Sequence, residues 1–234
     1  RKQVDPPQWV KPLIYLSIPW AVSIHTVTAF LYAGLPGRHF WLTAIMAARF
    51  LASAFAAGPA LLILLCLIVR KVSKFDPGKE AIQKVANIVV YAMIISIFFV
   101  VLEIFTAFYS QIPGHMHGFV YTFVGLHGHG NLVPWTWAFA VMAVIATLML
   151  LCPPLRKNET TLAISCLLVF FSLWIEKGIT LVITGFIPNP FDTITEYVPT
   201  IPELAITVGV WATGFLILTI LYKIAVSVKE EIAS

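Results

Sequence analysis

The sequence predicts an all-α protein, a polytopic bundle of transmembrane helices. Hydrophobic residues make up 59% of its 234 positions and charged residues only 11%, whereas soluble domains carry roughly 25% charged residues. Six segments are apolar over the roughly 20 residues that a helix needs to cross the hydrocarbon core. They run from about Leu13 to Ala33, Trp41 to Val69, Val85 to Ser110, Val133 to Leu151, Thr161 to Phe186 and Glu203 to Val226. We expect residues 1–234 to form a single transmembrane domain.

The positions of Lys and Arg predict how the chain crosses the membrane. Basic residues gather before the first helix, after the second, between the fourth and fifth, and after the sixth, whereas Arg38 alone lies in a turn on the other side. Cytoplasmic loops are enriched in Lys and Arg. We therefore predict a multi-pass protein of the cytoplasmic membrane with both termini cytoplasmic, and with outer loops at 111–132 and 187–202. The net charge of +4 comes from these loops, so no nucleic-acid partner is expected.

The first helix carries His25 in its apolar stretch, and Tyr32 shares its face at a spacing of seven residues. Two interpretations stay open for His25, an interhelical hydrogen bond or a functional imidazole, because histidine is rare at membrane depth. In the second helix, the Arg49 guanidinium cannot lose its proton, so it needs an acidic or ligand oxygen within reach. Glu103 or Glu176 could be a structural partner, and a bound ligand is the alternative.

Two further helices carry charges inside apolar segments. Glu103 lies in the third helix, and Glu176 and Lys177 are adjacent in the fifth. Ionisable residues at membrane depth are unfavourable and usually face a bundle interior or an aqueous path. A carboxyl group there suits proton transfer, and a salt bridge between helices is the alternative for Glu103. Ser172, Thr180 and Thr184 share one helical face with Glu176 by their four-residue spacing.

Counting about 1.5 Å per helical residue puts His25, Arg49, Glu103 and Glu176 in one layer, about 10 to 15 Å below the outer surface. The formal charges of Arg49, Lys177, Glu103 and Glu176 cancel, as a buried cluster requires. A quinone site needs an apolar, aromatic-lined slot with polar groups at its two carbonyls. The sequence supplies such side chains near the outer face, and the predicted quinone-binding set is His25, Tyr32, His39, Trp41 and Arg49.

Metal cofactors within this chain are not expected. Its three cysteines are scattered, without the CxxC or four-Cys runs of iron–sulfur and zinc sites. A b-type haem needs two facing histidines, and His25 is the sole intramembrane histidine. The segment 111–132 contains two His-x-His pairs, at His115 and His117 and at His127 and His129. No acidic or Cys ligand joins them, so a folded outer loop is favoured over a metal site.

Two stretches carry a resemblance to a known family, HTVTAFLYAGLPGRHFWLTAIMAARFLASAFAAGPALLIL (25–64) and WIEKGITLVITGFIPNPFDTITEYVPTIPEL (174–204). They resemble the NrfD family, the membrane subunits of polysulfide-reductase-type quinone oxidoreductases, and most of all the DsrP-type subunit of the sulfate-reducer complex DsrMKJOP. The resemblance implies menaquinone binding without haem, and an iron–sulfur partner on the outer face. Family members usually have eight to ten helices, so we expect this chain to be the last six of ten.

The predicted function is that of a quinone-interacting subunit in a respiratory electron-transfer complex, rather than a complete enzyme. We expect menaquinol to bind near the outer face in sulfur or sulfate respiration, and a ferredoxin-like iron–sulfur subunit to take up the electrons. His25 would hydrogen-bond a quinone oxygen and accept its proton, while Glu103, Glu176 and Lys177 relay protons or hold the fold. An ion-translocating, transporter-like subunit and a purely structural membrane anchor are the alternatives.

Overall fold

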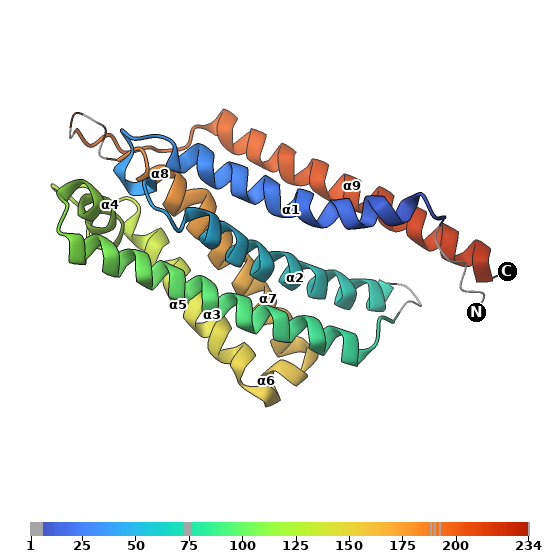
Figure 1. The fold of residues 1–234 in the computed structure, drawn as a ribbon. Helices are drawn as coiled ribbons and strands as arrows, with labels where there is room; N and C mark the ends of the chain where they lie inside the picture. The colour runs from blue at the N-terminus through green and yellow to red at the C-terminus, as the bar shows by residue number, and fades with distance from the viewer. Residues whose placement is uncertain (1–6, 73–75, 188, 190, 192, 234) are drawn as a thin grey trace. The chain divides into compact units, whose positions relative to one another are not determined.

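All regular structure in the described residues is helical (Figure 1). The computed structural model describes residues 7–72, 76–187, 189, 191 and 193–233. Within them, six helices are long and apolar enough to cross a membrane, which confirms the predicted all-α fold and its six spanning segments. Pro188, Pro190 and Asp192, part of the predicted outer loop 187–202, lie outside the described residues.

The elements have the following bounds, in chain order. They are α1 (Val10–Ala33), the 3-10 turn η1 (His39–Trp41), α2 (Met46–Val72), α3 (Lys79–Ser110), α4 (Pro113–Phe123), α5 (Val133–Leu151), α6 (Pro153–Lys157), α7 (Glu159–Trp174), the π-helical segment η2 (Ile175–Leu181), α8 (Val182–Thr184) and α9 (Ile201–Ala233).

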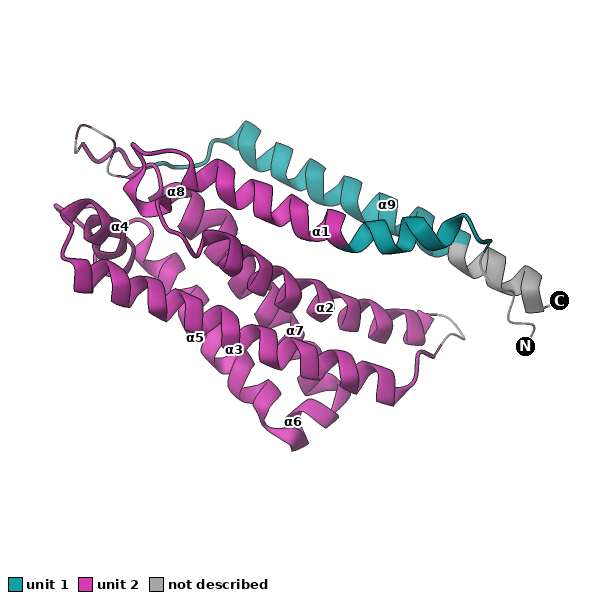
Figure 2. Cartoon of the chain, viewed as in Figure 1, with its two compact units in different colours: residues 1–18, 197–234 teal, residues 19–196 magenta. Residues whose placement is uncertain are grey.

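The chain forms two compact units (Figure 2). The first unit contains the beginning of α1, up to Ile18, and the segment from Tyr197 through α9. None of the apolar window of α9 is buried, and its apolar residues point in all directions around the helix axis, as in a helix that lies among lipids or other helices. The second unit, Pro19–Glu196, contains every charged or histidine residue of the predicted site.

The second unit has one large core, built where α2, α3, α5 and α7 pack against one another. Small side chains lie at the contacts, and Ala56, Ala60, Ala86 and Ala146 are fully buried. Helices in membranes approach most closely at such residues, which lets van der Waals contact replace the hydrophobic driving force that lipid removes. The alanine-rich second helix of the sequence is therefore central in this unit.

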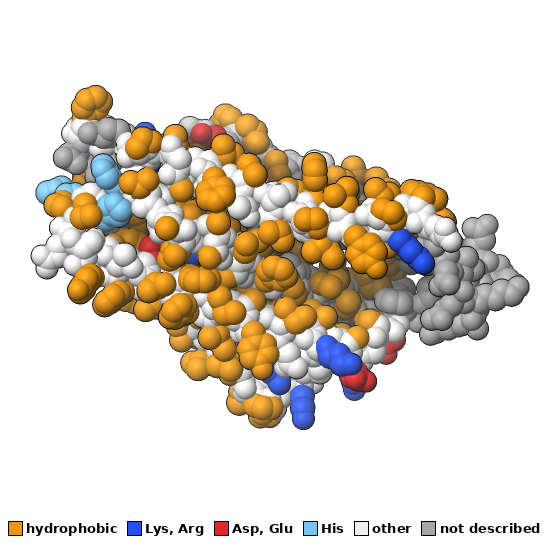
Figure 3. Space-filling model, in the orientation of Figure 1, with side chains coloured by type: hydrophobic (Ala, Val, Ile, Leu, Met, Phe, Trp, Pro, Cys, Tyr) orange, Lys and Arg blue, Asp and Glu red, His pale blue; other side chains and the backbone are white. Residues whose placement is uncertain are grey.

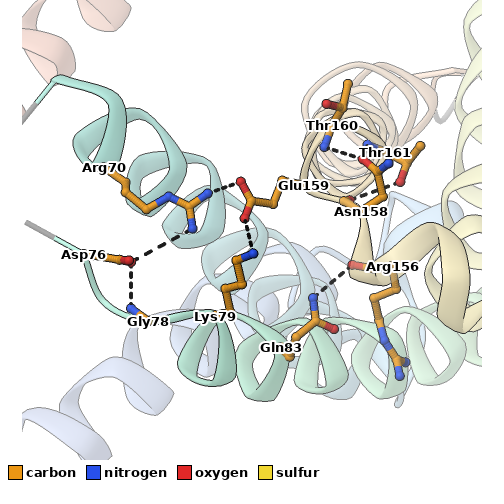
Figure 4. A network of polar contacts seen from close by, with 10 residues as sticks. All are labelled: Arg70, Asp76, Gly78, Lys79, Gln83, Arg156, Asn158, Glu159, Thr160 and Thr161. Carbon is orange, nitrogen blue, oxygen red and sulfur yellow. Dashed lines mark hydrogen bonds and ion pairs between the residues drawn. The ribbon is translucent and has the colours of Figure 1, made fainter.

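A polar network joins the helix ends at the basic side of this unit (Figure 4). Arg70 at the end of α2 pairs with Glu159 in the first turn of α7. Lys79 Nζ lies 4.0 Å from the same carboxylate. The Asn158 side chain caps α7 by accepting from Thr160 N–H at 2.9 Å, which satisfies one of the free amides of that helix end.

The segment 111–132, expected as a loop, contains the helix α4. Pro113 begins it, at a position where a missing N–H is harmless. Its Gly118 fits tightly on η1, because an added Cβ would lie 2.5 Å from the Phe40 ring. Hydrophobicity at the level of whole spans did not reveal this short helix. It lies at the end of the second unit away from Arg70, which we call the outer end after its predicted orientation.

Candidate functional site

Three helices bring their buried charges into one cluster. Arg49 of α2 forms ion pairs with Glu103 of α3 and with Glu176 of η2. The exposed fractions of the three residues are 5%, 6% and 2%, so only a small part of each is accessible to solvent. The sequence offered either carboxylate as a partner of Arg49. The structure shows both, one on each side of a single guanidinium.

Lys177 completes the cluster. Its Nζ lies 3.1 Å from Glu176 Oε1 and 4.9 Å from the centre of the Phe50 ring, over the ring face. Two positive and two negative charges therefore meet, and their formal sum is zero. Such balance is needed because an unpaired charge in a low-dielectric interior is strongly unfavourable.

Glu176 and Lys177 lie in the π-helical segment η2, which the sequence analysis did not predict. The buried stripe Ser172, Glu176, Thr180, Thr184 is inward-facing as expected. In a π-helix, however, the backbone bonds run from i to i+5, and such segments often occur at functional sites. Among the described residues, the hydroxyls of Thr180 and Thr184 and Glu176 Oε2 have no hydrogen-bond partner. Each hydrogen bond of a π-helix spans one residue more than in an α-helix. The four-residue spacing in the sequence does not reveal this extra residue.

A small cavity adjoins this segment. It measures about 20 Å³, and Arg49, Thr122, Glu176 and Thr180 provide its polar lining. A cavity of roughly 10 to 15 Å³ by this measure is enough for one water molecule if polar partners surround it. The free Glu176 and Thr180 oxygens are such partners.

A larger pocket lies at the outer end, between η1, α3 and α4. It measures about 270 Å³. Glu103 lines it together with His39 and His115, whose ring centroids are 6.1 Å apart. Its remaining lining is Phe40, Leu42, Thr43, Ala44, Ile45, Leu102, Thr106, Ala107 and Phe119. Glu103 thus belongs both to the ion cluster and to a pocket wall. Sequence reasoning placed His115 in a loop and did not connect it to Glu103, since α4 was not foreseen.

Within the described residues, the predicted quinone-binding side chains have different surroundings. Trp41 is buried, and its Nε1 donates to the Leu181 carbonyl at 2.8 Å. Tyr32 contacts the Trp41 ring edge-on, with centroids 4.7 Å apart. His39 lines the outer pocket, and Arg49 belongs to the ion cluster. His25 is half-buried on α1, and within the described ranges it has no hydrogen-bond or ion-pair partner.

An apolar pocket lies beside the aromatic pair Tyr32 and Trp41. It also measures about 270 Å³ and is lined by Phe30 and Ala33 of α1, by residues 42–44 between η1 and α2, and by Met46 and Ala47 in the first turn of α2. Its lining of small and aromatic side chains suits an isoprenoid tail or a lipid chain better than a polar group. It gives the α1 side of the second unit an apolar recess near Tyr32 and Trp41.

The outer end also carries most of the histidines (Figure 3). There Glu196, the last residue of the second unit, is fastened to the turn after α4. Its carboxylate accepts from Asn131 N–H at 2.9 Å and from the Tyr121 hydroxyl at 3.2 Å, and it lies 3.4 Å from His129 Nδ1. The Asn131 N–H is the main cause that lowers the pKa of Glu196, whereas burial raises the pKa of Tyr121. In the part of the chain that the structure describes, no three His, Cys, Asp or Glu residues form a metal-binding group.

The fold and this site define a multi-pass helical membrane protein with an ionisable cluster in its interior. Residues 5–188 match the family model described as "Polysulphide reductase, NrfD". Because the match covers most of the chain, the protein belongs to the NrfD family, as the resemblance implied. One curated relative is a putative dimethyl sulfoxide reductase membrane subunit of Halobacterium salinarum, 24% identical over 224 residues. The match covers 86% of this chain and 50% of the relative, so the chain spans about half the length of that relative.

Proposed function

We propose that this chain serves in a membrane redox complex, where it binds menaquinone near the outer face and exchanges electrons with an iron–sulfur subunit. Membership of the NrfD family supports the quinone reaction, and the curated relative is named as a reductase membrane subunit. The observation that carries the proposal is the neutral cluster around Arg49, because one of its carboxylates, Glu103, also lines an outer pocket. Intramembrane charges of this kind mark substrate or proton paths.

His25 is the proposed partner of a quinone oxygen. Menaquinol, when bound, supplies two electrons and two protons. The half-buried His25 imidazole has a free hydrogen-bonding capacity within the described structure, which suits the acceptance of one proton. Tyr32 and Trp41 would form an apolar wall, since the Trp41 N–H is already donated to Leu181. Arg49 would act through charge rather than direct ligand contact, because two carboxylates occupy its guanidinium.

The ion cluster is the proposed route for protons. Lys177 pairs with Glu176 and lies over the Phe50 ring, whereas Glu103 lines the outer pocket. Protons would pass from one carboxylate to the other and change the charge of each in turn. Arg49 would stay protonated throughout, because a guanidinium keeps its proton.

The outer end is the proposed docking side for the iron–sulfur partner, and sulfur or sulfate respiration is the proposed pathway. The charge pattern supports this orientation, since the Arg70 end of the second unit carries the basic residues typical of the cytoplasmic side. Both termini would then be cytoplasmic, and the protein would lie in the cytoplasmic membrane.

The direct test is His25→Ala in the assembled complex, with Ser23→Ala as a control on an exposed position of the same helix. We expect quinol-dependent reduction of the partner cluster to fall at least about 100-fold, the usual contribution of a positioned acid–base group, while Ser23→Ala leaves it unchanged. Unchanged reduction in His25→Ala would remove that role.

A transporter-like subunit and a structural anchor are the rival functions, and the charged cluster gives the first some support. Lipid extraction of the purified complex separates them. The proposal requires stoichiometric menaquinone, an ion-translocating subunit requires ion flux without bound quinone, and an anchor shows neither.

A further inference from the structure

We propose that the outer pocket is an aqueous proton port, through which Glu103 exchanges protons with the outer face by way of His39 and His115. The inference rests on the proposed function, because it names the exit for the protons that the site handles. It also predicts water access that can be measured without any quinone.

The dimensions of the pocket fit this role. Water occupies about 30 Å³ per molecule in the liquid, so about 270 Å³ holds several molecules. The polar groups that line the pocket differ in solvent exposure: His39 is exposed, His115 is half-buried and Glu103 is buried. The pocket thus has proton-accepting groups both at its exposed side and beside the ion cluster, and water between them would complete the path.

An aromatic pair separates the pocket from the interior cavity. Phe40 and Phe119 line both spaces, and their ring centroids are 5.0 Å apart. Of these two spaces, Glu103 lines the outer pocket, whereas Arg49 and Glu176 line the small cavity. Water in the port can therefore reach one carboxylate of the cluster, while the other stays behind the rings.

Charge balance then couples the two sides. With both carboxylates ionised, the cluster is neutral, and a proton added to Glu103 leaves a net positive charge in a low-dielectric site. A proton that arrives on Glu176 likewise makes the cluster net positive. When that proton passes to the ionised Glu103 carboxylate, Glu176 is ionised again. Glu103 then releases the proton from its Oε atom to pocket water or to an imidazole, which restores the neutral cluster. No bond other than O–H and N–H changes, and Arg49 remains charged.

The imidazoles suit the transfer. Burial and the nearby His39 lower the pKa of His115, so His115 is neutral near pH 7 and can accept a proton. The ionisable groups that face the pocket are His39 from η1, Glu103 from α3 and His115 from α4, and Arg49 stands behind Glu103.

The first experiment measures water access in the complex. A cysteine introduced by Thr106→Cys, which lines the pocket, should react from outside with a charged methanethiosulfonate reagent. Val101→Cys, an exposed position of the same helix, is the lipid-facing control and should not react beyond the unsubstituted background. Equal labelling of the two variants, or labelling of Thr106→Cys by apolar maleimide alone, would overturn the port.

The second experiment measures proton transfer. We expect His115→Gln to slow quinol-driven reduction of the partner about 10-fold or more with unchanged KM for quinol, and external imidazole to restore the rate. His127→Gln, an exposed imidazole outside the pocket, is the control. Loss of bound quinone, or a raised KM in His115→Gln, would make the pocket a quinone site and contradict the port. A complex without quinone would refute the proposed function, yet Thr106→Cys labelling would still decide the port.

Discussion

Arg49 and Glu176 form a buried ion pair although 127 positions separate them in the sequence. The pair links the start of α2 to the π-helical segment η2, and Glu103 extends it to α3. One guanidinium therefore fixes three helices relative to one another, in a layer where lipid offers no alternative partner. This structural role is compatible with the proposed proton transfer, because protonation of either carboxylate would change the charge balance of the cluster.

Arg49→Gln is expected to destabilise the protein by about 3 to 5 kcal/mol, because removal of one partner leaves buried charge uncompensated. The double variant Arg49→Gln with Glu176→Gln should recover part of that loss, since one unpaired carboxylate is then gone. Thermal unfolding of the purified complex measures both, and Lys157→Gln at an exposed position is the control. Equal stability of Arg49→Gln and Lys157→Gln would contradict a structural role for the pair.

Gly185→Ala is expected to disrupt the packing of Trp41 and Tyr32. An added Cβ would overlap the Trp41 ring, which is buried and held by its bond to Leu181. Overpacking of this kind costs about 1 to 3 kcal/mol. Gly58→Ala meets no atom within 4 Å and should stabilise α2 by about 0.5 to 1 kcal/mol, as alanine favours a helix over glycine. A thermal-shift comparison of the two variants tests this, and a similar loss in both would refute the packing argument.

The contact of Glu196 should weaken in acid. The pKa of Glu196 lies below its ordinary value because the Asn131 N–H, and then His129 and Tyr121, stabilise the ionised carboxylate in the folded protein. The stabilisation is therefore present above the unfolded pKa of about 4.3 and is lost as pH falls through the lower folded value. At a pH near the unfolded pKa, pepsin should cleave the wild type around Glu196 more slowly than it cleaves Glu196→Gln. The ratio of the two rates at the same pH should approach one as pH falls through the folded value, and Thr195→Ala, at an exposed position, should behave as the wild type. A rate ratio that is the same at every pH would argue against this fastening.

The pair Arg70 and Glu159 is expected to contribute little to stability. Their side chains are 20% and 41% exposed, and solvent-exposed ion pairs contribute about 0.2 to 1 kcal/mol. A double-mutant cycle with Arg70→Ala and Glu159→Ala in thermal unfolding should give a coupling energy in that range, smaller at high salt. A coupling above about 3 kcal/mol would instead indicate a pair as important as the buried one.

The sequence predicted the elements of the site better than their grouping. Hydrophobicity and length predict six spans, because a bilayer requires about 20 apolar residues per helix. Depth counting brought Arg49, Glu103 and Glu176 to one layer, and the structure joins them. The same count included His25, which lies apart from them on α1, because depth along a helix does not fix the direction in which a side chain points.

Composition and the placement of charges were enough to predict the class of protein, its helical spans and the need of Arg49 for an acidic partner, and two sequence stretches were enough for its family. Burial in lipid makes this possible, since it constrains hydrophobicity and charge at every position. Tertiary packing was needed to learn that Arg49 bridges two carboxylates, that η2 is π-helical, and that α4 brings His115 over Glu103. Those features depend on helix rotation and on the close packing of glycine and aromatic side chains, which no periodicity along a single segment encodes.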